Sequence, residues 1–141
     1  QTQTRLLSVV SDLAPMPSET AHLDEATNNK QMSRAIENQI RDSDDVSVAA
    51  NNWIVTAEFY AAVHYTDAVL SQSGLHPDGH GERFDLVNRR DAFTSRAATV
   101  YESLYDLSVQ SRDECSQMHA GQVNSARKAL GILKSELPNV G

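Results

Sequence analysis

The chain has 141 residues, of which 40% are apolar and 22% are charged, the balance of one soluble globular domain. Its net charge is −7, so it lacks the broad basic surface of an avid duplex-DNA binder. No apolar run reaches the roughly 20 residues that cross a bilayer, and no charged-then-apolar leader opens the chain. Its single cysteine, Cys115, cannot form an internal disulfide. We therefore expect a cytoplasmic protein with no membrane partner.

Proline and glycine separate long stretches of helix-forming residues, and no run alternates apolar and polar side chains, so the sequence predicts an all-α protein. The first element is a short amphipathic helix over residues 4–14, which two prolines end. A second helix is expected over 18–41, with Ser18 as its N-cap. An acidic linker over 42–45 then places negative charge before the next helix.

The third helix, expected over 46–73, is the most apolar part of the chain. Its apolar side chains lie on more than one side, as they do in a helix that is buried all round. They are Trp53, Ile54, Ala57, Ala61, Tyr65, Ala68 and Val69. We therefore expect this helix to be the central one.

Three more helices are expected after a glycine-containing loop. They run over 82–88, 92–119 and 123–137. Four long helices with short links predict an up-and-down four-helix bundle, with residues 1–17 as an N-terminal extension that carries an extra short helix. We expect residues 1–141 to form one domain.

The five histidines do not have a metal-binding spacing in the sequence. Neither a His-Glu-x-x-His pattern nor the Glu-x-x-His pairs of a di-metal bundle is present. Pro77 and Gly79 separate His76 from His80, so these two histidines do not share one regular helix turn. The sequence therefore predicts no metal site and no cofactor.

His64 stands on the expected central helix and has two interpretations. It is either a core histidine hydrogen-bonded to Asp67, Glu58 or a backbone carbonyl, or a ligand-binding or catalytic histidine. The turn from His80 to Arg83 also has two interpretations. It either caps the short helix and fixes the loop, or it forms one wall of a phosphate-binding cleft, since helix N-termini and arginine attract anions.

The segment from Ser111 to His119 holds residue types that suit metal-free phosphodiester chemistry. Arg112 and His119 are seven residues apart, so on one continuous helix they share a face, about 10 Å apart along the axis. A neutral histidine can accept the proton of an RNA 2′-OH, an arginine can stabilise the growing phosphate charge, and Asp113 can orient either side chain. A two-fold dimer closes the gap by bringing two copies of the pair into one cleft. The structural alternative is that both residues interact with a helix end.

Three stretches of the chain resemble the HEPN superfamily of small helical-bundle domains. The segment from Asn52 to Ala68 is similar to the W-x-V-T-x-x-F-Y-A-A-x-H-Y-x-x-A helix of an uncharacterised bacterial and archaeal HEPN-like group. The residues His80-Gly81-Glu82-Arg83 are similar to its H-x-x-R turn. The segment from Tyr101 to Arg112 is similar to its Y-x-x-L helix that runs into a Ser-Arg step. The three matches keep their order and lie within residues 23–137.

In HEPN ribonucleases the active motif is Arg, four to six residues and then His, often with Asn, Asp or His after the Arg. Arg112, six intervening residues and His119 fit that motif, with Asp113 after the Arg. The resemblance implies a homodimer whose cleft lies between the protomers and holds no metal. The candidate site residues are Arg112, His119 and Asp113 for catalysis and His80, Arg83 and His64 for binding.

The function that the resemblance implies is a metal-independent endoribonuclease that cuts single-stranded RNA. Many members of the family are toxins or host-defence ribonucleases, commonly neutralised by a small nucleotidyltransferase antitoxin. Others have lost catalysis and only bind nucleotides or proteins, so a non-catalytic HEPN-like binding module is the alternative. A bundle that serves only for dimerisation within a larger assembly is a third.

Overall fold

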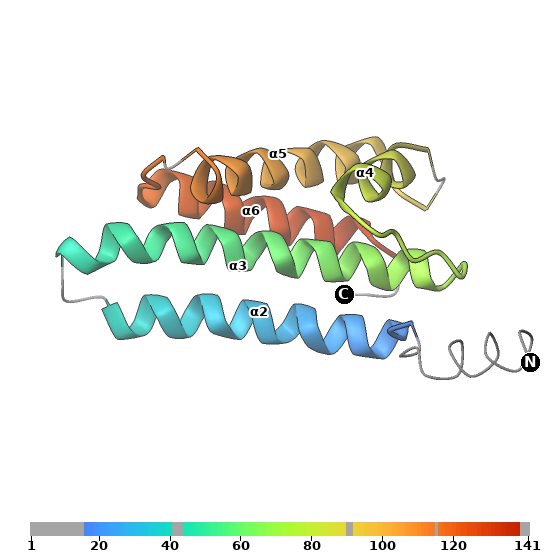
Figure 1. Cartoon of the computed structure of the whole chain (residues 1–141), viewed down its shortest axis with the longest axis horizontal. Helices are drawn as coiled ribbons and strands as arrows, with labels where there is room; N and C mark the ends of the chain where they lie inside the picture. Colours follow the sequence, from blue (N-terminus) through green and yellow to red (C-terminus); the bar gives the residue numbers. More distant parts are fainter. Residues whose placement is uncertain (1–15, 41–43, 90–91, 115, 139–141) are drawn as a thin grey trace, which may run out of the picture.

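The computed structural model describes residues 16–40, 44–89, 92–114 and 116–138 of the chain. The regular secondary structure within these ranges consists of helices, joined by turns and loops, which confirms the predicted all-α class (Figure 1). The helices are α2 Glu19–Ile40, α3 Asp44–Ser71, α4 His80–Arg89, α5 Ser95–Arg112 and α6 Ala120–Glu136. The predicted helix over 4–14 lies outside the described residues.

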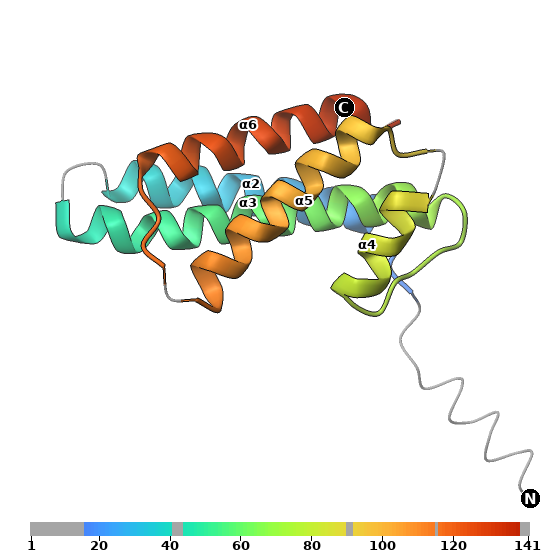
Figure 2. The same ribbon diagram turned by 90° about the horizontal axis from the view of Figure 1, so that it is seen from above.

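The helices pack in a way that is consistent with a bundle, and α3 is its central member. In Figure 1, α2 lies along one side of α3, and α5 and α6 lie on the other side. Figure 2 shows α5 crossing obliquely over α3, while α4 lies at the end of the bundle where α3 ends. None of the described helices has an apolar stretch long enough to cross a lipid bilayer.

Almost every residue of α3 between Ile54 and Leu70 is buried, as expected for the central helix. Only Tyr60 and His64 in this stretch are half-buried, and because they are four residues apart they lie on the same helix face. Trp53 differs from the prediction, since its side chain is 69% exposed. A helix that is apolar on several sides carries no periodic signal to say which of its end residues faces solvent.

Local hydrogen bonds set several helix ends. Ser18 Oγ accepts a hydrogen bond from Ala21 N at 3.1 Å, which confirms the predicted N-cap of α2. Thr94 caps α5 in the same way, which explains why α5 begins at Ser95 rather than at residue 92. The helix α3 begins at Asp44, so part of the predicted acidic linker is helical. The turn after the C-terminal end of α3 contains Gly74, whose φ of +73° lies in the left-handed region that glycine adopts without strain.

A buried ion pair fastens α4 to α3. Arg83 donates from Nε to Asp67 Oδ1 at 2.7 Å and from Nη2 to Asp67 Oδ2 at 3.0 Å, so the pair is bidentate. Both side chains are less than 10% exposed. The two hydrogen bonds compensate for taking both charges out of water, and loss of one partner leaves the other charge buried and unpaired.

Replacing Arg83 with Met is therefore expected to lower the free energy of unfolding by about 3–5 kcal/mol, because the Asp67 carboxylate stays buried without its partner. Urea denaturation of the wild type and the variant measures the difference. Arg96→Met is the matched control, since Arg96 is exposed and pairs with Glu136 at only 3.5 Å; its cost should be below about 1 kcal/mol. Equal losses in the two variants would show that the buried pair has no special role.

Candidate functional site

The link between α5 and α6 is held in place by two asparagines of α3. Asn52 Nδ2 donates to the carbonyl oxygens of Ser111 at 3.1 Å and Ser116 at 2.8 Å, and its Oδ1 accepts from Met118 N at 3.0 Å. Asn51 Nδ2 donates to Met118 O at 3.1 Å. Two side chains thus satisfy four backbone groups of the link, which gives it a defined path.

This anchoring changes the predicted relation between two candidate catalytic residues. The predicted helix over 92–119 ends at Arg112, and His119 is the N-cap residue of α6. Gln122 Oε1 accepts from His119 N at 2.9 Å, as the residue at this position does in a capping box. The prediction that Arg112 and His119 share one helix face is therefore wrong, because the chain leaves the helix between them. His119 and Asp113 are both exposed.

The guanidinium of Arg112 lies over two aromatic rings of α3. Its Cζ atom is 5.6 Å from the ring centroid of Phe59 and 5.7 Å from that of Tyr60, which are cation–π distances. Its Nη2 donates to Ser108 Oγ at 3.1 Å, and its Nη1 donates to Tyr60 Oη at 3.4 Å. Its Nε is buried and has no hydrogen-bond partner in the described part of the chain. The guanidinium of Arg112 is thus held in place, and its Nε can still donate a hydrogen bond.

His80 reaches the same aromatic cluster from the start of α4. Its ring centroid is 5.4 Å from that of Phe59 and 5.7 Å from that of Tyr105. Burial lowers the pKa of His80, and the positive charges of Arg83 and Arg112 lower it further. The imidazole is therefore neutral at pH 7. We call the group Phe59, Tyr60, His80, Tyr105 and Arg112 the Arg112 site.

Two open hollows border the Arg112 site. The first has a volume of about 440 Å³ and is lined by Asn52, Trp53, Thr56, Tyr60, Ser111 and Arg112. The second has a volume of about 240 Å³ and is lined by His80, Gly81, Phe84, Glu102, Tyr105 and Asp106. Each is lined in part by aromatic side chains. Aromatic rings beside an arginine are suited to stacking nucleobases while the arginine contacts a phosphate.

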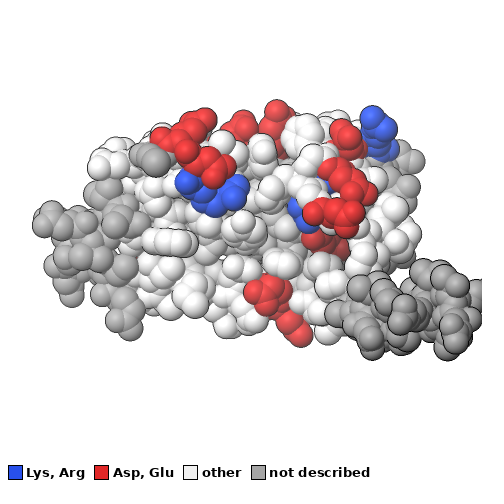
Figure 3. Space-filling model, in the orientation of Figure 1, with Lys and Arg blue, Asp and Glu red and all other residues white. Residues whose placement is uncertain are grey.

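Basic side chains are sparse on one face of the molecule. On the face shown in Figure 3, Lys and Arg side chains are few, and acidic side chains lie beside them. This agrees with the net charge of −7 and with a small site rather than a long basic track.

Arg83, a predicted binding residue, is not available in the same way as Arg112. Its Nε and Nη2 both donate to Asp67 within the fold, and its Nη1 lies 3.4 Å from His80 Nδ1. Glu82 Oε2 accepts from Asp78 N at 3.1 Å, so the turn at the start of α4 fixes its own loop. The capping and loop-fixing interpretation of this turn therefore describes Glu82 and Arg83, whereas His80 belongs to the Arg112 site.

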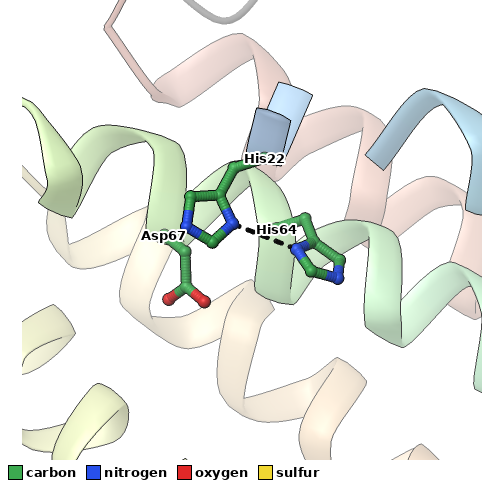
Figure 4. A group of neighbouring side chains, drawn as sticks. All are labelled: His22, His64 and Asp67. Atoms are coloured by element: carbon green, nitrogen blue, oxygen red, sulfur yellow. Dashed lines mark hydrogen bonds between the residues drawn. The ribbon is translucent and has the colours of Figure 1, made fainter. Parts of the chain in front are cut away.

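His64 has a partner that the sequence did not suggest. Its Nδ1 lies 3.2 Å from Nδ1 of His22 in α2, and the predicted hydrogen bond to Asp67 or Glu58 is absent from the described contacts (Figure 4). Glu58 instead accepts from Ser33 Oγ at 2.7 Å and lies 3.7 Å from Arg127. Since 42 residues separate His22 from His64, no spacing rule could have paired them.

No protein-family model matches this chain, and no curated protein matches it. The resemblance to the HEPN superfamily therefore stays a prediction from the motifs.

Replacing Asn52 with Ala is expected to lower the free energy of unfolding by about 1–3 kcal/mol, because backbone groups of the link lose their partner. Urea denaturation measures the loss, and amide hydrogen exchange at Met118 should accelerate. Asn88→Ala is the control, since Asn88 is exposed and its Nδ2 donates to Phe84 O within its own helix. A loss no larger than the control's would mean that the link does not depend on Asn52.

The half-buried His80 predicts a dependence of stability on pH. Its pKa is below the ordinary value of 6.5, so the unfolded chain binds its proton more readily than the folded chain does. The free energy of unfolding is therefore highest well above pH 6.5, where His80 is neutral in both states. It decreases as the pH falls below 6.5, because protonation then favours the unfolded chain. The wild type should therefore lose more unfolding free energy than His80→Gln between about pH 7 and pH 5. Urea titrations at several pH values test this, and parallel curves would contradict it.

Proposed function

We propose that this protein is an HEPN-type endoribonuclease that cuts single-stranded RNA without a metal. The single observation that supports the proposal is the setting of Arg112, whose guanidinium is held over Phe59 and Tyr60 in the wall of the larger hollow. A single-stranded chain offers unstacked bases to aromatic rings and an exposed phosphate to the arginine. The HEPN resemblance brings with it the up-and-down order of four helices, which is part of the same proposal.

In this mechanism His119 accepts the proton of the 2′-OH, whose oxygen attacks the adjacent phosphorus. Arg112 stabilises the charge that builds on the phosphate oxygens, and Asp113 orients the pair. The leaving 5′-oxygen takes a proton from water, His119 returns its proton to the solvent, and the product ends in a 2′,3′-cyclic phosphate. DNA lacks the 2′-OH and should resist cleavage.

The proposed enzyme is a homodimer, in which His119 of one protomer acts beside Arg112 of its partner. This arrangement suits two residues that lie at the ends of different helices. Trp53 supports the choice of face, because an exposed tryptophan in the wall of the larger hollow gains from burial against a second copy. A toxin of this kind would work in the cytoplasm and would be neutralised by a nucleotidyltransferase-type antitoxin.

The second candidate is a non-catalytic module that binds a nucleotide. It is favoured by the fact that the Arg112 site gathers an arginine, a neutral histidine and aromatic rings without His119. In that case Arg112 and His80 would contact a phosphate and nothing would be turned over.

Incubating labelled single-stranded RNA with the purified protein in EDTA separates the two candidates. The wild type should cleave RNA but not the matching DNA, and Arg112→Ala and His119→Ala should each be slower by a factor of about 100 or more. Arg96→Ala, which changes an exposed arginine outside the Arg112 site, should cleave like the wild type.

Cleavage by all variants at equal rates would show that Arg112 and His119 are not the catalytic residues. If no protein cleaves RNA but the folded wild type binds nucleotide and Arg112→Ala does not, the binding module is supported. Circular dichroism and gel filtration establish folding and oligomeric state for each variant.

A further inference from the structure

A cluster of three possible metal ligands lies away from the Arg112 site, where α2 packs on α3. His22 comes from α2, and His64 and Asp67 come from successive turns of α3 (Figure 4). The two Nδ1 atoms are 3.2 Å apart, and one ligand atom of each of the three residues lies within 4.8 Å of the other two. Imidazole nitrogen and carboxylate oxygen are the ligands of Zn²⁺ sites in which three protein groups leave a fourth position open.

The spacing of the two imidazole nitrogens fits a shared metal ion. Ligand nitrogens at about 2.0–2.1 Å from a tetrahedral Zn²⁺ are about 3.3 Å from each other. The distance of 3.2 Å between the His22 and His64 Nδ1 atoms matches that edge. Asp67 offers a carboxylate oxygen within 4.8 Å of a ligand nitrogen of each histidine.

The state of the ligands also suits a cation. His22 is buried and His64 is half-buried, and an imidazole in its neutral form offers a nitrogen lone pair to a metal ion. Asp67 and Glu25 both act on the ring of His64 as negative charges, while Arg83 acts as one positive charge. At His22 the negative charge of Asp67 is opposed by the positive charge of Arg83.

Arg83 supports the third ligand rather than replacing it. Its two hydrogen bonds take one lone pair from each oxygen of Asp67 and fix the plane of the carboxylate. Hydrogen-bonded partners of this kind orient the carboxylate ligands of metal sites. His22 and Asp67 are buried and His64 is half-buried, so the cluster lies at the edge of the core.

We propose that His22, His64 and Asp67 form a binding site for a divalent transition metal of the Zn²⁺ type, which ties α2 to α3. The site has a structural role and takes no part in the proposed RNA cleavage. Without metal, the same two histidines share one hydrogen bond between Nδ1 atoms, and this is the alternative that the experiment must exclude.

Titration of metal-free, tag-free protein with ZnCl₂ in a calorimeter tests the proposal. We expect one ion per chain and a rise of several degrees in the melting temperature when the ion is in excess. His22→Ala and His64→Ala should each weaken binding at least tenfold. His119→Ala is the matched control, because it removes an exposed histidine at the N-terminal end of α6, and its affinity for Zn²⁺ should equal that of the wild type.

Substitution of Co²⁺ in the wild type gives a second test that does not depend on any variant folding. A site with two nitrogens, one carboxylate and one open position should give the intense visible absorption of a four-coordinate Co²⁺ ion. Absence of Zn²⁺ binding, or equal affinity in all three variants, would overturn the proposal. Because cleavage is measured in EDTA, RNA hydrolysis and metal binding succeed or fail independently.

Discussion

The buried pair of Asp67 and Arg83 is the interaction on which both candidate sites depend. It joins α4 to α3 by two hydrogen bonds out of contact with water. Because His80 begins α4, the pair also sets the position of that imidazole beside Phe59. On the other side, it orients the carboxylate that stands next to His22. One ion pair therefore fixes geometry at the Arg112 site and at the histidine cluster together.

The class of fold and the central helix could be predicted from the sequence because they follow from composition. Helix-forming stretches between prolines and glycines allow no other regular structure, and the most apolar stretch must be covered on all sides. The exposure of Trp53 could not be predicted, because a helix that is apolar on all sides has no polar face to mark the side that meets solvent. Single caps such as Ser18 were visible because one side chain and its own helix suffice to form them.

The details of the sites depend on contacts between distant parts of the chain, which no local pattern contains. The end of α5 had one local signal, because Asp113 and Glu114 oppose the helix dipole at its C-terminus. The path beyond that end is set by Asn52, about 60 residues earlier in the chain. The pairing of His22 with His64 likewise arises only when α2 packs on α3.

The way in which Asn52 holds the link has a consequence for how such a protein can change over generations. The amide recognises main-chain groups, which every residue type except proline supplies in full. Substitutions at exposed residues of the link outside the proposed catalytic residues, such as Gln117, should therefore cost little, whereas Met118 is buried in the core. Its length is different, because one inserted or deleted residue would move every carbonyl out of register with the amide. Descendants of this chain should therefore differ in the residue types at such positions of the link but keep its number of residues.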